Sequence, residues 1–359
     1  REMICMKWLF QLSPDNQNTG WQAGYEPSFE NIGGFSHIHE WTMAGVSMMP
    51  TTGPLEIRQG SQNDPDSGYR SRFDKSSEQA PVGYYSANLT DYGIKAELTS
   101  TTRCGFHRYT FSRKTASRVL IDLQFGAEYA LQIQQVKIYK ADKHRIEGLS
   151  TYHSVCWGPV GQQDYTVHFV VEFDRPIKSF GVWKNDEIRS NANRLGAGAV
   201  KDAGAFAEFD TVENPVVQAR VGISLVSIQN AALNLKTEVT ERFGWDFDAV
   251  RRNHLRAWNE LLGRIEIHTS DRREKIRFYN NLYRSFCRNI WSDVNGKWVD
   301  GTEKVQQLKD PDEVALGCDA FWNTFWNLNQ LWNLAAPEWS SRWVKSQLAM
   351  YDALGWLAK

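Results

Sequence analysis

The sequence predicts a multi-domain β + α protein in which an antiparallel β-sandwich comes first and a helical region follows. Two observations carry this prediction. Residues 164–173, DYTVHFVVEF, place apolar or aromatic side chains at every second position, which is the period of a half-buried strand. After residue 228 the apolar spacing changes to that of helices. Several strand-length runs without intervening helices favour an antiparallel sandwich over a parallel α/β sheet.

The predicted strands lie in residues 1–228. Residues 93–111, 117–125 and 130–140 are strand-length runs separated by polar or glycine-containing turns. Residues 216–227 alternate in the same way as residues 164–173, with apolar side chains at Val217, Ala219, Val221, Ile223 and Leu225. We therefore assign residues 1–228 to the β-sandwich domain.

A helical linker is predicted for residues 229–266. Its helix, which Gly263 ends, has helical spacing at Phe247, Val250, His254, Trp258 and Leu261. The next helix opens at Asp271, which together with Glu274 resembles a capping box. The apolar face of that helix is expected to be Ile276, Tyr279, Tyr283 and Phe286.

Residues 267–359 are expected to be the first helices of an all-α domain. After the helix at Asp271, a third helix is predicted for residues 319–334, DAFWNTFWNLNQLWNL. A fourth begins near Pro337 and ends at Gly355, and it carries Trp339, Trp343 and Tyr351.

The third predicted helix has two unlike faces. At about 100° per residue, one face combines Phe321, Phe325, Leu328 and Trp332, as a core-facing stripe would. The opposite face combines Asp319, Trp322, Asn323, Trp326, Gln330 and Asn333. Aromatic rings interleaved with amides and one carboxylate fit a pocket for a polyol, while a satisfied polar network between helices is the alternative. A helix that uses both faces suits the inner ring of an α/α barrel.

Composition excludes several classes of partner. The chain has 41 basic and 42 acidic residues, so its net charge of −1 argues against nucleic acid or an anionic membrane. The mean hydropathy is −0.51, and no run of 18 apolar residues predicts a membrane span. Five cysteines, scattered singly, indicate neither a zinc site nor a disulfide scaffold. The 15 tryptophans suit stacking on sugar rings, although a large aromatic core is the simpler explanation of that count.

A second dense stretch of polar and aromatic residues lies in residues 20–50. It contains Trp21, His37, His39, Glu40 and Trp41 between glycines. His37 and His39 share one face of a strand and could ligate a metal, but the sequence has no third ligand at a spacing typical of a metal site. A loop that offers these side chains to a ligand, and a loop that packs one domain on the other, are the two remaining interpretations. Motifs for nucleophilic-serine or nucleotide chemistry are absent from the sequence.

The ordered motifs of the whole chain resemble those of glycoside hydrolase family 92. They are GFSHIHEWTMAG, TTRCGFHRYTF, WDFDAVRRNHLRAWNELLGRIEI, SDVNGKW, FWNTFWNLNQLW and LAMYDALGWLAK. The resemblance implies a calcium-dependent exo-acting α-mannosidase that inverts configuration. It also implies an N-terminal sandwich joined by helices to an (α/α)6 barrel, with the site between them.

The resemblance assigns substrate contacts to both stretches. Trp41, with Glu40 and His39, would contact the leaving sugar, and Trp322 with Asn323 would touch the terminal mannose. The family commonly has Asp where this chain has Asn323, and Asp319, one turn earlier, is the candidate to supply a carboxylate. The full set of expected substrate-binding residues is Trp21, His39, Glu40, Trp41, Asp319, Trp322, Asn323, Trp326, Trp356 and Lys359.

Catalytic and metal-binding residues are left unassigned, because the family's acid, base and most calcium ligands are expected in later barrel helices than those of this chain. The expected partners are a mannose-containing glycan and the remaining part of the barrel. The expected location is secreted, periplasmic or cell-surface, although residues 1–14 contain no recognisable signal peptide. Two alternatives are a non-catalytic glycan-binding paralogue or fragment and a related hydrolase or phosphorylase acting on α-glucosides.

Overall fold

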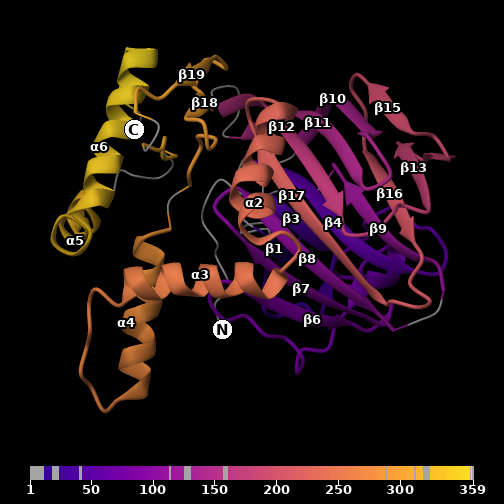
Figure 1. Cartoon of the computed structure of the whole chain (residues 1–359), viewed down its shortest axis with the longest axis horizontal. Helices are drawn as coiled ribbons and strands as arrows, with labels where there is room; N and C mark the ends of the chain where they lie inside the picture. The colour runs from indigo at the N-terminus through magenta and orange to yellow at the C-terminus, as the bar shows by residue number, and fades with distance from the viewer. Residues whose placement is uncertain are drawn as a thin grey trace.

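The computed structural model describes residues 12–17, 24–39, 43–112, 115–124, 131–156, 161–287, 289–310, 313–317, 324–355 and 357. Strands fill the part of the chain up to Ser224, and helices dominate the part that follows (Figure 1). This order confirms the fold class predicted from the change in apolar periodicity. None of the helices in these residues is both long enough and apolar enough to cross a lipid bilayer.

Two antiparallel sheets make up the first part. In spatial order, the first contains β1 (Ser13–Asp15), β3 (Gly34–His39), β4 (Ala44–Thr52), β9 (Ser117–Asp122), β16 (Ala203–Phe209), β13 (Ser179–Lys184) and β14 (Glu187–Ser190). The second contains β15 (Arg194–Ala197), β10 (Leu131–Lys140), β11 (Arg145–Cys156), β12 (Gly161–Phe173), β17 (Val216–Ser224), β8 (Cys104–Phe111), β7 (Ile94–Ser100) and β6 (Tyr85–Leu89). Two short ladders join β2 (Asn31–Ile32) to β5 (Ser71–Arg72) and β18 (Lys297–Val299) to β19 (Val305–Gln307).

The two large sheets pack face to face around one apolar core. Rings from opposite sheets meet in it: Phe35 and Tyr85 have centroids 6.3 Å apart, and Phe173 and Phe209 have centroids 4.7 Å apart. The alternating residues of β12 all lie in this core, as their period predicted: Tyr165, Val167, Phe169, Val171 and Phe173. The predicted strands at residues 93–111, 117–125, 130–140 and 216–227 are likewise present, the first as the hairpin of β7 and β8.

Helices cover the outer face of the second sheet. This layer comprises α1 (Ile228–Leu235), a π-helical turn (Lys236–Thr240), α2 (Glu241–Phe243) and the start of α3 (Phe247–Leu262). Ala231, Leu235 and Phe247 pack there against Phe106 and Val170 of the sheet. Gly222 permits this approach, because a Cβ on it would lie 2.4 Å from the Ala231 carbonyl oxygen. The predicted apolar spacing of α3 is confirmed at Phe247, Val250, His254 and Trp258, which are buried, and Gly263 ends the helix.

The remaining helices confirm two predicted positions and correct several details. The helix α4 (Arg272–Ser285) starts after Asp271, whose carboxylate accepts the Arg273 amide at 2.7 Å. The predicted capping box is wrong, because Thr269 Oγ1 accepts the Asp271 amide and Glu274 pairs with Arg277. On α4, Ile276 is exposed and Leu282 is buried in its place. The helix α6 (Pro337–Leu354) ends at Gly355 in the left-handed conformation, and Trp339 and Trp343 are buried while Tyr351 is exposed.

The prediction of one continuous helix over residues 319–334 is wrong in the part that the structure describes. Thr324–Trp326 form a single 3₁₀ turn, Asn327 departs from helical geometry, and α5 (Leu328–Ala335) then begins. Trp332 is buried as predicted, but Phe325 is 59% exposed. The Gln330 side-chain amide donates to the Phe325 carbonyl at 2.7 Å, so a side chain satisfies the turn where the helical ladder is broken.

Candidate functional site

Eight of the ten predicted substrate-binding residues lie outside the described residues. They are Trp21, Glu40, Trp41, Asp319, Trp322, Asn323, Trp356 and Lys359. His39 and Trp326 are described, and so are the segments from which the other predicted residues emerge. The described residues show what holds the ends of the two predicted segments.

Two predicted segments, residues 18–23 and 40–42, start close together at the edge of the first sheet. We call the described residues that flank each segment its root. Gln17 and Gly24 pair through backbone hydrogen bonds of 2.8 and 2.6 Å and so enclose residues 18–23, which include Trp21. His39 ends β3, directly before Glu40 and Trp41, and pairs with Ala44 of β4. The His39 ring lies against Gly24, because a Cβ on Gly24 would be 3.1 Å from Nε2. The structure thus brings together the positions at which these two segments leave the sheet.

The His39 ring lies against the buried carboxylate of Asp15. Its Nδ1 lies 2.9 Å from Oδ1 of Asp15, and the two side chains are 11% and 0% exposed. The other carboxylate oxygen of Asp15 accepts the Ser36 amide at 2.9 Å. His39 is therefore mostly enclosed at the base of the predicted loop.

Buried polar side chains fix the surroundings of both roots. Arg70 is 2% exposed, and its guanidinium donates to the Asn16 carbonyl at 2.5 Å and to Asn31 Oδ1 at 2.6 Å. Burial lowers the pKa of Arg70 to about 10, which leaves it cationic at neutral pH. Ala44 follows residues 40–42 in the sequence. The Tyr165 hydroxyl donates a hydrogen bond to the Ala44 carbonyl at 3.0 Å and accepts one from the Ala44 amide at 2.8 Å. Both ends of this segment are consequently tied to the core.

The alternative of a metal site at His37 and His39 finds no support in the described residues. His37 Nδ1 lies 2.5 Å from the Val46 carbonyl, and its Nε2 lies 2.9 Å from His107 Nε2. His107 Nδ1 in turn meets the Tyr109 hydroxyl at 2.7 Å. Since the Val46 carbonyl can only accept, His37 carries its proton on Nδ1 and His107 carries its proton on Nε2. Burial lowers the pKa of His37 to about 4, so the hydrogen-bonded series of His37, His107 and Tyr109 is neutral at neutral pH.

The second predicted stretch ends in an exposed aromatic pair. Trp326 is 68% exposed and meets the neighbouring Phe325 edge to face, with centroids 5.7 Å apart. Thr324, which comes directly after the undescribed residues 318–323, is buried. The exposed indole of Trp326, three residues after Asn323 in the sequence, thus offers a flat apolar platform.

A buried polar seam joins the helical region to the sandwich, and the residue patterns alone did not single it out. Asp293, 3% exposed, accepts hydrogen bonds from Ser224 Oγ at 2.7 Å, Asn230 Nδ2 at 2.7 Å and Asn234 Nδ2 at 2.6 Å. Burial raises the pKa of Asp293, while these three donors oppose that shift. The motif SDVNGKW contains this aspartate, which was the one signal available in the sequence.

A buried ion pair extends the same seam. Arg103, in the turn between β7 and β8, lies 2.6 Å from Glu238 of the π-helical turn, and both side chains are about nine-tenths buried. The Glu238 carboxylate also accepts the Arg103 amide at 2.8 Å and the Thr101 hydroxyl at 2.6 Å. Arg103 Nε donates to the Ser292 carbonyl at 2.6 Å. Three segments far apart in the sequence therefore meet at one guanidinium.

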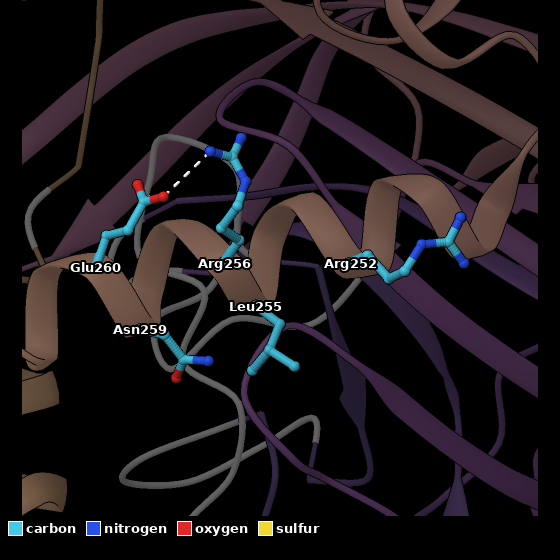
Figure 2. A pocket seen from close by; sticks show the side chains of 5 residues that line it. All are labelled: Arg252, Leu255, Arg256, Asn259 and Glu260. Atoms are coloured by element: carbon cyan, nitrogen blue, oxygen red, sulfur yellow. Dashed lines mark hydrogen bonds and ion pairs between the residues drawn. The ribbon is translucent and has the colours of Figure 1, made fainter.

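A surface depression on α3 is separate from these features. It has a volume of about 440 Å³ and is lined by Arg252, Leu255, Arg256, Asn259 and Glu260 (Figure 2). Arg256 and Glu260 form an ion pair of 3.1 Å across one helical turn. Because a single helix supplies all the lining residues and no predicted site residue is among them, we assign it no role.

Comparison with known proteins places the chain in a family. The model described as "Glycosyl hydrolase family 92 N-terminal domain" matches residues 9–224, and that described as "Glycosyl hydrolase family 92 catalytic domain" matches residues 230–359. The class is that of glycoside hydrolases, and the chain belongs to glycoside hydrolase family 92.

Solved structures of that family share the fold. A GH92 alpha-mannosidase from Bacteroides thetaiotaomicron, solved in complex with mannoimidazole, is 26% identical with a TM-score of 0.85, and the match covers 96% of this chain and 45% of that chain. A GH92 inverting mannosidase from the same organism is 20% identical with a TM-score of 0.80, covering 99% of this chain and 46% of that one.

One curated relative is an "Uncharacterized secreted glycosidase" of Arthroderma benhamiae. It is 25% identical over 314 residues, which are 80% of this chain and 38% of the relative. The chain thus spans less than half the length of the relatives that it matches.

Proposed function

We propose that this chain provides the sandwich and the first catalytic-domain helices of an exo-acting α-mannosidase. The likeness to the B. thetaiotaomicron alpha-mannosidase carries the proposal, because it extends over 96% of the chain at a TM-score of 0.85. The substrate class is a glycan with terminal α-linked mannose, of N-glycan or mannan type. The ordered arrangement of loop roots around His39 and the exposed Trp326 supports a sugar-binding role.

The described residues supply positioning in this mechanism. Tyr165 and the His39–Asp15 contact hold the segment that carries Glu40 and Trp41, the expected contacts of the leaving sugar. Trp326 offers an apolar surface on which a sugar ring can stack. Inversion further requires an acid and a base, with carboxyl groups about 6.5–9.5 Å apart so that a water fits between base and sugar. We assign neither carboxylate within this chain.

Calcium dependence is part of the proposal. Calcium takes six to eight oxygen ligands and would bring hydroxyl coordination and charge to the sugar. Among the described residues, no three His, Cys, Asp or Glu side chains gather closely enough to hold a metal ion.

Further helices of the barrel are the proposed partner of the helical region. Large apolar side chains are exposed on and beside α5 and α6, namely Leu334, Val344, Leu348, Tyr351 and Leu357. A soluble protein seldom leaves so many of them open to water, which supports packing of additional helices on this side as the inner and outer rings of an (α/α)6 barrel. Secretion is supported by the fungal relative, whose name describes it as secreted.

The test is mannose release by the complete enzyme. We expect release of mannose from α-mannosides in the presence of calcium, and loss of that activity on chelation followed by recovery when calcium is restored. NMR of the first product should show the β-anomer of mannose. Failure to release mannose from every α-mannoside tested would overturn the proposal.

A non-catalytic glycan-binding protein is the second candidate. Asn323 favours it, because an amide can hold a hydroxyl but brings no charge where the family commonly has Asp. This candidate predicts mannoside binding by calorimetry without turnover in the complete protein. Restoration of the charge by Asn323→Asp would then raise affinity but release no mannose.

A further inference from the structure

Two buried serine hydroxyls hold one short segment of the helical region. Ser292 Oγ accepts the Ala315 amide at 3.1 Å, and Ser346 Oγ accepts the next amide, that of Leu316, at 3.0 Å. Ser346 Oγ also lies 2.8 Å from the Val314 carbonyl. The two serines are 1% and 3% exposed, so each hydroxyl satisfies a backbone group that water does not reach.

The same segment pairs with the chain in front of Ser292. The Trp291 amide donates to the Ala315 carbonyl at 2.7 Å, and the Gly317 amide donates to the Asn289 carbonyl at 2.7 Å. The Trp291 indole lies directly on Gly317, where a Cβ would be 2.3 Å from Nε1. Gly317 is therefore required for the close approach of residues 289–291 and 315–317, which hold it on two sides.

These contacts connect the segment to both halves of the molecule. Ser292 is joined to the sandwich, because Arg103 donates to its carbonyl and the adjacent Asp293 is bonded to Ser224 and α1. Ser346 belongs to α6. Residues 314–317 are thus held by Ser292, which is itself bonded to the sandwich, and by Ser346 of α6. We call Ser292 and Ser346 the serine clamp.

The clamp acts on the chain directly before the predicted sugar contacts. Gly317 precedes Asp319 by two residues and Asn323 by six. We propose that Ser292 and Ser346 are positioning residues, which hold residues 314–317 in place and so anchor the described chain that precedes the predicted sugar contacts. This inference rests on the proposed function for the identity of the ligand, but the clamp itself is testable without it.

The test uses single variants of the complete protein. Ser292→Ala and Ser346→Ala each leave a buried amide without its acceptor, while Ser346→Thr retains the hydroxyl. Ser117→Ala is the matched control, because Ser117 is also fully buried and its hydroxyl bonds Thr211 at 2.6 Å, but it lies in β9 of the sandwich. We would measure mannoimidazole affinity by calorimetry, kcat and KM on an aryl α-mannoside, thermal unfolding, and hydrogen exchange of peptides covering residues 313–317.

We expect both alanine variants at the clamp to weaken mannoimidazole binding about tenfold and to raise KM, with faster exchange confined to residues 313–317. Ser346→Thr should keep near wild-type affinity, and Ser117→Ala should lower the unfolding temperature without changing affinity. Equal loss of affinity in Ser117→Ala and the clamp variants would overturn the inference. If the unmodified protein neither binds nor turns over the ligand, the proposed function fails, and exchange alone decides the clamp: unchanged protection of residues 313–317 in Ser292→Ala and Ser346→Ala would then reject it.

Discussion

The sandwich and the helical region differ in how completely each encloses its own apolar residues. In the sandwich, Phe169, Tyr109 and Val182 are fully enclosed between two sheets. In the helical region, α6 buries Trp339 and Trp343 on one side but leaves Val344 and Leu348 more than half exposed on another. The core of the sandwich is enclosed by its own two sheets, whereas α6 has one packed apolar face and one apolar face exposed to solvent. A helix of the proposed barrel would need neighbours on two sides, whereas each sheet of the sandwich packs against the other sheet of the same domain.

The largest difference is expected from truncation of equivalent aromatic rings in the two regions. Phe169→Ala removes a fully buried ring from β12, and we expect the free energy of unfolding to fall by about 3–5 kcal/mol. Phe325→Ala, which removes a 59% exposed ring, should change it by less than about 0.5 kcal/mol. Denaturant titration of both variants measures the contrast, and similar losses would show that Phe325 is covered in solution.

The seam between the regions should be the next most sensitive place. Glu238→Gln removes the charged hydrogen-bond partner of the buried Arg103 guanidinium, at an expected cost of about 3 kcal/mol. The matched control is Asp352→Asn, which removes the exposed ion pair with Lys309 and should have no measurable effect. Urea unfolding of the two variants provides the comparison. A loss at Glu238 no greater than at Asp352 would contradict a structural role for the seam.

Acid should weaken a separate contact between α3 and the sandwich, that of His254. Its Nδ1 donates to the Ser100 carbonyl of β7 at 2.8 Å and its Nε2 accepts the Trp258 indole N–H at 2.9 Å, so the ring is neutral in the folded state. Burial lowers the pKa of His254 from 6.5 to about 4. The unfolded state therefore binds a proton that the folded state does not, and stability falls by about 1.4 kcal/mol per pH unit as the pH drops from 6.5 towards 4.

The difference between wild type and His254→Gln isolates this contribution from the other titrating groups. We expect the stability gap between them to be largest above pH 6.5 and to shrink on acidification. A gap that stays constant between pH 7 and pH 4.5 would show that His254 is not the group responsible.

The smallest effect is expected on the open face of α6. Leu348→Lys places a charge at a position that is 55% exposed, so the stability of residues 1–359 should change by less than about 0.5 kcal/mol. In a longer chain that carries the proposed further helices, the same substitution should be clearly destabilising, because it would bury a charge. Thermal unfolding of both proteins makes the comparison, and equal tolerance would argue against barrel helices on this face.

Local pattern predicted the elements well where one face of an element is buried and the other is not. The alternation in residues 164–173 and the spacing of Phe247, Val250 and His254 were confirmed as β12 and α3. The same reasoning failed at Ile276 and Phe325, both of which are exposed. Periodicity identifies a stripe of apolar side chains, but it does not say whether another element covers that stripe.

The sequence predicts two stretches as the candidate site, which stays a prediction, and it gave no indication of the contacts around them. Composition and motif order pointed to the segments containing Trp41 and Trp322, while the contacts that hold those segments join distant residues. Asp15 reaches His39, Arg103 reaches Ser292, and Tyr165 holds Ala44. No local period or spacing encodes such pairs, because each depends on the packing of separate elements.

The sequence by itself determined the order of sandwich and helices, the strands β7, β8, β9, β10, β12 and β17, the helices α3, α4 and α6, and the family, because these follow from local periodicity and motif order. Tertiary structure alone decided that Asn327 interrupts the third predicted helix. It also decided that His37 and His107 are buried, neutral and hydrogen-bonded to each other. Finally, it decided that Ser292 and Ser346 accept hydrogen bonds from two adjacent backbone amides. Burial is the physical reason for the division. Whether a polar group needs a partner, and which one it finds, is fixed only when folding removes it from water.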